Sequence, residues 1–287
     1  MDARILDRLR CPVCGEPLTE AVAGTAQALR CPRRHSFDVA RQGYVNLLAG
    51  RAPHVGDSAE MVAARADFLT AGHYDLISTA LAEAAVAVTP PVAGAYPLVV
   101  DAGAGTGRYL AAVLAALPDA VGLALDVSKP ALRRAARAHP RAAAALADTW
   151  QRLPLADGAA DLLLNVFAPR NGPEFRRVLH PAGALLVVTP AEEHLAELVG
   201  PLGLLRVDPT KEDRVASSLG AQFTRVGVAL HRSELTLTRP EVATLVGMGP
   251  SAWHTDPAGL ASRIAALAEP VRVTVAVRLA VWRPIPS

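Results

Sequence analysis

The sequence predicts an α/β protein, in which a parallel sheet is covered by helices and preceded by a small metal-stapled module. Two observations predict this architecture. From about residue 96, apolar strand segments alternate with amphipathic helix segments, which is the pattern of βαβ units. All three cysteines lie within the first 31 of the 287 residues. We therefore expect a metal-binding module at residues 1–50, a helical connector at 51–95 and the α/β domain at 96–287.

Composition limits the class of protein. Hydrophobic residues make up 51% of the chain and charged residues 20%, the balance of a globular protein rather than a disordered one. The apolar runs are shorter than the roughly 20 residues of a membrane-spanning helix. The N-terminus lacks the apolar segment of a signal peptide, so we expect a cytoplasmic protein without membrane contact and without structural disulfides. A net charge of +2 is too small to indicate a nucleic-acid-binding protein by itself.

Four side chains near the N-terminus have the spacing of a zinc site. Cys11, Cys14, Cys31 and His35 form the pattern C-x2-C-x16-C-x3-H. Two thiolates separated by two residues can bind one tetrahedral ion, and the second pair closes the site from a hairpin away. Because a Cys3His set leaves no open coordination position, we expect a structural zinc ion. A module of this size needs such an ion to hold its fold.

This module leaves alternatives open. Cys11 and Cys14 alone could form a redox C-x-x-C pair, although the strand that usually precedes such a pair is missing here. His35 could instead be solvated, with water or another residue as the fourth ligand. The module also combines arginines with aromatic rings, as proteins that bind looped RNA do. The same residues are equally consistent with a solvated charged face and two core aromatics. They are Arg30, Arg33, Arg34 and Arg41, with Phe37 and Tyr44.

The connector has helical periodicity that is broken at Gly72 and ended by the Pro90–Pro91 pair. We expect residues 56–58, Gly-Asp-Ser, to line a cleft between the module and the α/β domain. Asp57 has an alternative role as the N-cap of the helix that starts near Ser58.

The α/β domain repeats the order strand, glycine turn, helix, strand. Helices are expected at 108–118 and 129–140, between the first three strands. The final segment alternates with a period of two, so we expect it to close the sheet near one edge. The expected strand segments are 97–102, 120–126, 143–148, 161–166, 184–190 and 271–284.

The first strand runs into a glycine-rich loop, "LVVDAGAGTGRYL". Glycines there let the backbone pass close to a ligand. The dinucleotide fingerprint G-x-G-x-x-G requires a third glycine where this chain has Arg108. The form D-x-G-x-G-x-G resembles instead motif I of the S-adenosylmethionine-dependent methyltransferases, whose cofactor carries an ammonium group that an acid can meet. The cofactor-binding candidates in this loop are Asp101, Gly103, Gly105, Thr106 and Gly107.

Two further acids follow the next two strands. Asp126 lies 19 residues after Gly107, where a carboxylate can accept hydrogen bonds from both ribose hydroxyls. Asp148 ends the third strand, and in methyltransferases of this class an acid there approaches the adenine amino group. Each acid taken singly could be a helix N-cap or a turn residue. Together with the glycine loop they favour a cofactor site.

The fourth strand is followed by the loop "NVFAPR", which would face the substrate because ligands bind beyond the carboxyl ends of parallel strands. Phe167 could stack on a base or pack against the sheet, and Arg170 could hold a phosphate or a base edge. The residues of this loop identify no catalytic group, and its substrate-facing candidates are Asn165, Phe167, Pro169 and Arg170.

Taken together, the motifs "CPVCGEPL…CPRRHSFDVARQGYVNLL", "GDSAEMVAARADFLTAGHY", "VVDAGAGTGRYL" and "VFAPRN" resemble the bacterial 23S rRNA (guanine-N1)-methyltransferases, RlmA type, and especially the branch with the tylosin-resistance methyltransferase. The resemblance implies a Rossmann-like class I S-adenosylmethionine-dependent domain behind a zinc module that helps recognise an rRNA hairpin, often in a homodimer. It implies methylation of N1 of a hairpin-loop guanine, of the guanine-748 type, and a link to macrolide resistance.

Two other function classes stay open. A small-molecule S-adenosylmethionine-dependent methyltransferase could carry the same zinc module as a scaffold. A non-catalytic RNA-binding protein could retain the cofactor fold, although the intact set of acids and glycines argues against it.

Overall fold

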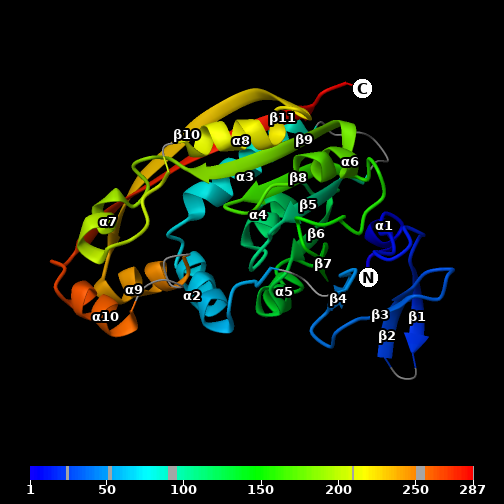
Figure 1. Ribbon diagram of the computed structural model, residues 1–287, viewed down its shortest axis with the longest axis horizontal. Helices are drawn as coiled ribbons and strands as arrows, with labels where there is room; N and C mark the ends of the chain where they lie inside the picture. Colours follow the sequence, from blue (N-terminus) through cyan, green and yellow to red (C-terminus); the bar gives the residue numbers. More distant parts are fainter. Residues whose placement is uncertain (24–25, 51–53, 90–95, 209, 250–255, 287) are drawn as a thin grey trace.

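The computed structural model describes residues 1–23, 26–50, 54–89, 96–208, 210–249 and 256–286 (Figure 1). At one end of the molecule lies the N-terminal module, opposite the end formed by helices α7, α9 and α10. The module has a short helix and an antiparallel three-stranded sheet in the order β1-β2-β3. Its elements are α1 (Ala3–Leu6), β1 (Thr19–Ala23), β2 (Ala26–Arg30) and β3 (Ser36–Asp38).

The module packs directly on the α/β domain. The backbone N–H of Arg10 donates to the carbonyl of Pro154 at 3.0 Å, and that of Ala156 donates to Arg8 at 2.9 Å. Leu9 is fully buried and forms a β-bridge with Leu155. The module therefore shares one apolar cluster with the α/β domain instead of standing apart from it.

The main sheet has eight strands in the order β10-β11-β9-β8-β5-β6-β7-β4. The six strands from β4 to β9 in this order run parallel, β11 pairs antiparallel with β9, and β10 pairs antiparallel with β11. The chain order reverses at β5, which is where open α/β sheets bind ligands. The strands are β4 (Tyr44–Asn46), β5 (Leu98–Ala102), β6 (Val121–Asp126), β7 (Ala142–Leu146), β8 (Ala160–Val166), β9 (Leu179–Pro190), β10 (Phe223–Leu237) and β11 (Val271–Pro284).

Successive residues of the central strands belong to two separate cores. Val99 lies in the cluster on the face covered by α3 and α4, whereas its neighbours Leu98 and Val100 lie in the cluster on the other face, with α6, α8 and the module. Such strands are apolar throughout because both faces are buried. The helices are α2 (Ala59–Thr70), α3 (Asp75–Val88), α4 (Arg108–Ala116), α5 (Lys129–Ala135), α6 (Gly172–Val178), α7 (Ala196–Leu202), α8 (Lys211–Leu219), α9 (Arg239–Gly247) and α10 (Pro257–Ala265).

The predicted α/β fold is confirmed, and so are the strands and helices expected between 97 and 190. The connector is helical, with a break at Gly72, whose φ is +84°. Pro90 and Pro91 lie outside the described residues. The segment 271–284 is the strand next to the sheet edge, as expected. Among the described residues, no helix combines the length and the apolar character needed to cross a membrane.

Strand β4 is the main unexpected element. Residues 44–46 fall inside the expected module, yet they pair with β7 and form one edge of the main sheet. Tyr44 is 8% exposed and packs in the core of the α/β domain, so it is a core aromatic and not a ring offered to RNA. The division of the chain at residue 50 stays a prediction.

Candidate functional site

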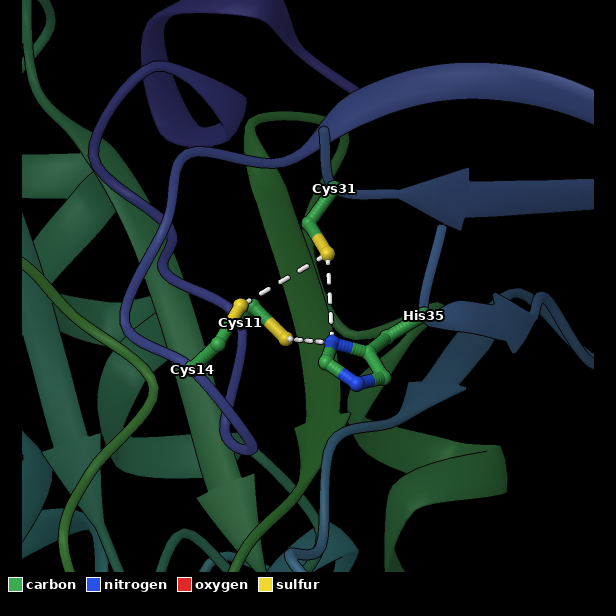
Figure 2. Close-up of side chains that lie close together, drawn as sticks. All are labelled: Cys11, Cys14, Cys31 and His35. Atoms are coloured by element: carbon green, nitrogen blue, oxygen red, sulfur yellow. Dashed lines mark hydrogen bonds between the residues drawn. The ribbon is translucent and has the colours of Figure 1, made fainter. Parts of the chain in front are cut away.

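The four expected zinc ligands lie together at one side of the module (Figure 2), with their ligand atoms within 4.8 Å of one another. Nδ1 of His35 is 3.5 Å from the Cys11 sulfur and 3.3 Å from the Cys31 sulfur, and the Cys14 and Cys31 sulfurs are 3.7 Å apart. A tetrahedral zinc ion, with bonds of about 2.3 Å to sulfur and about 2.0 Å to nitrogen, separates its ligand atoms by about 3.5–3.8 Å. The three cysteines are free thiols, so the cluster fits zinc bound through Nδ1.

Two tight turns bring these ligands together. The first turn closes where the N–H of Gly15 donates to the Cys11 carbonyl at 2.8 Å, with Gly15 at φ +76°. In the second, the N–H of Arg34 donates to the Cys31 carbonyl at 2.9 Å, and Arg34 has φ +68°. Such a left-handed conformation is uncommon for a residue with a side chain. Each turn places both of its ligands on the same side of the chain.

The glycine loop after β5 runs against the loop after β8. Gly103 has φ +86°, and a Cβ added there would come within 2.4 Å of the Cβ of Ala168. Gly107 has φ +78°, and a Cβ there would meet the backbone of Ala135 in α5 at 3.0 Å. Only glycine fits both positions without movement of the neighbours. The structure thus brings the expected cofactor loop and the expected substrate loop into contact.

Asp101 lies just before this loop, and its carboxyl group is buried without a hydrogen-bond partner for either oxygen among the described residues. Burial and then the charge of Asp126 raise the pKa of Asp101 to about 8. A buried, unpaired carboxyl group is unfavourable unless a donor or a cation meets it. This orphaned group therefore fits the ammonium end of S-adenosylmethionine.

Asp126, at the end of β6, binds two backbone groups. Its Oδ2 accepts from the N–H of Gly105 and its Oδ1 from the N–H of Ser128, both at 2.8 Å. Burial raises the pKa of Asp126, and these two hydrogen bonds oppose that rise. Each oxygen keeps a second lone pair for a hydroxyl donor. The carboxylate is thus fixed in place with acceptor capacity to spare.

Asp148 follows β7, and both of its oxygens are engaged. Oδ1 accepts from the N–H of Trp150 at 2.9 Å, and Oδ2 lies 2.8 Å from Nδ1 of His54. The side chain of Asp148 is 2% exposed, whereas that of His54 is half exposed. The connector therefore reaches across the sheet edge to the third expected acid.

The connector residues after His54 form a strap, residues 54–58, along the same edge. Gly56 lies so close to Ser128 that a Cβ there would be 2.7 Å from its backbone nitrogen. The hydroxyl of Ser128 donates to the carbonyl of Asp57 at 2.8 Å. The carboxylate of Asp57 pairs with Arg65 of α2, whose other terminal nitrogen donates to the Met248 carbonyl at 2.7 Å.

The alternative role of Asp57 as a helix N-cap is wrong. Ser58 is the N-cap of α2, and its hydroxyl accepts from the N–H of Met61 at 3.2 Å. The side chain of Asp57 is committed to Arg65 instead. A hydroxyl one residue later can cap the helix equally well, which the sequence pattern does not resolve.

The loop after β8 presents its candidate residues in different ways. Asn165 is fully buried, and its amide donates to the carbonyls of Ala102 at 3.2 Å and Pro169 at 2.8 Å, so it ties the loop to β5. Pro169 is exposed, and Arg170 is half-buried with its Nη1 3.2 Å from the Ala168 carbonyl. Phe167 is 41% exposed and has φ +54°. The ring of Phe167 is therefore presented to solvent by a strained backbone.

An aromatic cluster surrounds that ring, and sequence reasoning missed two of its members. Tyr74 and His194 lie 6.4 Å and 6.0 Å from Phe167 between ring centroids. The N–H of Ala276 donates to Nδ1 of His194 at 3.2 Å, and Nε2 lies 3.3 Å from the Tyr74 hydroxyl. Tyr74 belongs to the connector motif "AGHY", which was a usable signal, whereas nothing around His194 marks it.

Comparisons with known proteins agree with this geometry. Residues 9–52 match the family model described as RlmA, N-terminal, a zinc ribbon, and residues 99–186 match the model described as methyltransferase domain. The first of these covers all four expected zinc ligands, and the second contains the glycine loop and the three acids. S-adenosylmethionine and zinc are therefore the cofactors of this chain.

Three curated relatives cover most of its length. A Micromonospora griseorubida protein named "Putative 23S rRNA (guanine-N(1)-)-methyltransferase" is 69% identical over 99% of this chain and 100% of its own. The Streptomyces fradiae 23S rRNA (guanine(748)-N(1))-methyltransferase is 52% identical over 100% of both chains. A Bacillus subtilis (strain 168) protein named "Putative 23S rRNA (guanine-N(1)-)-methyltransferase YxjB" is 30% identical over 85% of this chain and 86% of its own. The chain belongs to the family of 23S rRNA (guanine-N1)-methyltransferases.

Proposed function

We propose that this enzyme transfers the methyl group of S-adenosylmethionine to N1 of a hairpin-loop guanine in 23S rRNA, at the guanine-748 position that the Streptomyces fradiae relative's name gives. The observation that carries this proposal is the end-to-end match with that relative. Such an enzyme acts in the cytoplasm, where ribosomes assemble. By the resemblance to the tylosin-resistance branch, the added methyl group would lower macrolide binding.

The three acids and the glycine loop supply a complete set of cofactor contacts. We assign Asp101 to the ammonium group, Asp126 to the ribose hydroxyls and Asp148 to the adenine amino group. The loop from Gly103 to Gly107, which includes Thr106, lets the backbone approach the cofactor closely. When bound, S-adenosylmethionine supplies an electrophilic methyl group on its sulfonium. The strap at 54–58 would close the adenosine end, because it already contacts Ser128 and Asp148.

The loop after β8 would position the target base. Phe167 is an exposed ring next in the chain to Ala168, which meets Gly103, so we assign it to stacking on the guanine. Asn165 holds the loop in place through two carbonyls and acts as a positioning residue. Pro169 and Arg170 would border the flanking nucleotides. N1 of guanine carries a proton, so transfer requires in-line alignment of N1 and removal of that proton.

The zinc module would bind the hairpin. Arg30, Arg33, Arg34 and Arg41 are all exposed, and they would contact phosphates. Phe37 is half-buried and packs against the core, which leaves it little surface for a base. The zinc ion fixes the turn that carries Arg33 and Arg34, so it would act on RNA binding through shape alone.

We also propose a homodimer formed along β10. This strand is the last in the sheet, and its outer edge has no partner strand among the described residues. Val228 and Leu230 lie on one face of it and are 52% and 54% exposed. A long edge strand with exposed apolar side chains favours pairing with another chain.

The experiment that tests the reaction is methylation of protein-free 23S rRNA with labelled S-adenosylmethionine, followed by primer extension. A methyl group on N1 blocks Watson–Crick pairing, so reverse transcriptase should stop once, next to the target guanine. The variant Asp126→Ala should give no stop. The proposal would be contradicted if the protein bound S-adenosylmethionine but transferred no labelled methyl group to 23S rRNA or to its assembly intermediates. That result would favour the small-molecule alternative.

A further inference from the structure

Helix α5 and the turn after it expose an unusual set of cations. Lys129, Arg133, Arg134 and Arg137 are all exposed, and the helix contains no acidic residue. None of the four forms an ion pair with an acidic side chain of the described residues. Lys129 and Arg133 are four positions apart and therefore share one face, with about 5–6 Å between their Cβ atoms.

Arg141, the next arginine along the chain, has a structural role and serves as a comparison for the exposed set. The guanidinium of Arg141 donates to the carbonyl of Leu117 at 2.8 Å and also to those of Leu114 and Ala120, so it closes the end of α4. The side chains of Arg133, Arg134 and Arg137 make no such contact within the described part of the chain. Like charges four residues apart destabilise a helix, so folding alone does not explain the set.

The position of α5 connects the two parts of the proposed RNA site. The helix begins directly after Ser128, whose backbone N–H donates to the carboxylate of Asp126. We call this end of the sheet, where the expected cofactor residues lie, the cofactor edge. The other end of α5 touches the turn that leads from the module into β4, since a Cβ at Gly43 would lie 3.5 Å from that of Ala136. Figure 1 shows α5 between α2 and β4. Arg41, two residues before Gly43, is exposed at that junction and extends the cationic surface onto the module.

We propose that α5 binds the phosphate backbone of the rRNA hairpin where the RNA passes from the zinc module to the cofactor edge. The inference rests on the proposed function and adds a second RNA contact outside the module. RNA fits this surface because closely spaced guanidinium groups suit phosphates and α5 itself contains no acidic residue to repel them. Contacts of this kind give affinity and orientation without choosing the target base.

The test is the triple variant Arg133→Glu, Arg134→Glu and Arg137→Glu in the full chain, with a transcript of the guanine-748 hairpin as the probe. The Kd should rise at least about tenfold, and the slope of log Kd against log salt should fall by about 2–3, since each lost phosphate contact removes about 0.7–0.9. In methylation assays the loss should appear in the KM for RNA more than in kcat. The corresponding triple glutamine variant should show the same changes, although smaller.

The matched control reverses three exposed arginines elsewhere, in the loop after α7, on α10 and on β11: Arg206→Glu, Arg263→Glu and Arg272→Glu. It carries the same change in net charge, and its Kd should stay within about threefold of wild type. The inference would be overturned if the α5 variant had the Tm and the cofactor affinity of wild type and bound RNA no more weakly than the control. Methylation of the hairpin by the wild-type protein would in that case still support the proposed function. A wild-type protein that neither binds nor methylates the hairpin would overturn the proposed function as well.

Discussion

His54 and Asp148, 94 residues apart in sequence, meet at 2.8 Å across the edge of the sheet. This contact joins the connector to the acid assigned to the adenine amino group. Oδ1 of Asp148 accepts from the Trp150 backbone, whereas Oδ2 faces a half-exposed histidine side chain, so Oδ2 is the oxygen whose partner a ligand would displace. The connector therefore contacts the expected cofactor site directly.

The first prediction concerns this pair. Asp148→Asn should weaken S-adenosylmethionine binding by about tenfold or more, since a hydrogen bond to a charged group contributes about 1.5–3 kcal/mol. His54→Ala should bind the cofactor at least as tightly as wild type, because the remaining carboxylate is then free for the adenine. Isothermal titration calorimetry measures both values. Equal weakening in the two variants would mean that His54 is itself a cofactor contact.

A second prediction follows from the contact of the two loops. Gly103→Ala should destabilise the protein by about 1–3 kcal/mol or more, because the new Cβ meets Ala168 at 2.4 Å in a left-handed conformation. Gly247→Ala is the matched control. A Cβ there meets only the Cβ of Ala64 at 3.8 Å, an ordinary contact, so the change should be neutral or slightly stabilising in α9. Urea unfolding followed by circular dichroism compares the two. Similar midpoints would contradict the packing described for this loop.

The central part of this site could be predicted from the sequence. Asp101 and Asp126 lie at the ends of buried strands, and βαβ geometry places such strand ends along the same edge of a sheet. The cleft expected at residues 56–58 stays a prediction, and the contacts of the strap could not be predicted, because they depend on residues far away in the chain. Arg65 reaches the carbonyl of Met248, and nothing in the sequence near either residue indicates this. Strand β4 was missed for the same reason: three residues give no period, and only pairing with β7 defines them.

The buried carboxyl of Asp101 predicts a pH effect on stability. Its folded pKa of about 8 exceeds the unfolded value of about 3.9, so the folded protein binds the extra proton between these limits. The free energy of unfolding should therefore fall as the pH rises from about 4 to about 8. Asp101→Asn removes this loss and should exceed wild type near pH 8 by at least about 1 kcal/mol, or about 2–4 °C in Tm.

The matched measurement is thermal unfolding of both proteins across that pH range. The difference in Tm should be close to zero near the acid limit and should grow towards the alkaline one. S-adenosylmethionine binding by wild type should release protons, because its ammonium group stabilises the ionised carboxyl. A difference in Tm that does not change with pH would show that Asp101 does not titrate in this interval.

Removal of zinc should weaken RNA binding more than cofactor binding. Cys14→Ser breaks the cluster, and the turns that carry Arg33 and Arg34 lose their anchor. The variant should lose its bound zinc, and its Tm should be lower than that of wild type, since the module shares a core with the sheet. Metal analysis, calorimetry and hairpin binding measure the three effects. His180→Ala, which changes an exposed histidine on β9 that is not part of the cluster, should keep one zinc per chain. A Cys14→Ser protein that binds the hairpin normally would exclude the module from RNA recognition.

The last prediction tests the proposed dimer. Val228→Arg together with Leu230→Arg places two charges on the exposed face of β10, where they would oppose burial against a second chain. Sedimentation velocity should change from the mass of two chains to that of one. Val22→Arg is the control, because Val22 is 71% exposed on β1 of the module and should leave the mass unchanged. A wild-type protein that sediments as a single chain would refute the dimer, and a variant that stays paired would place the interface on another surface.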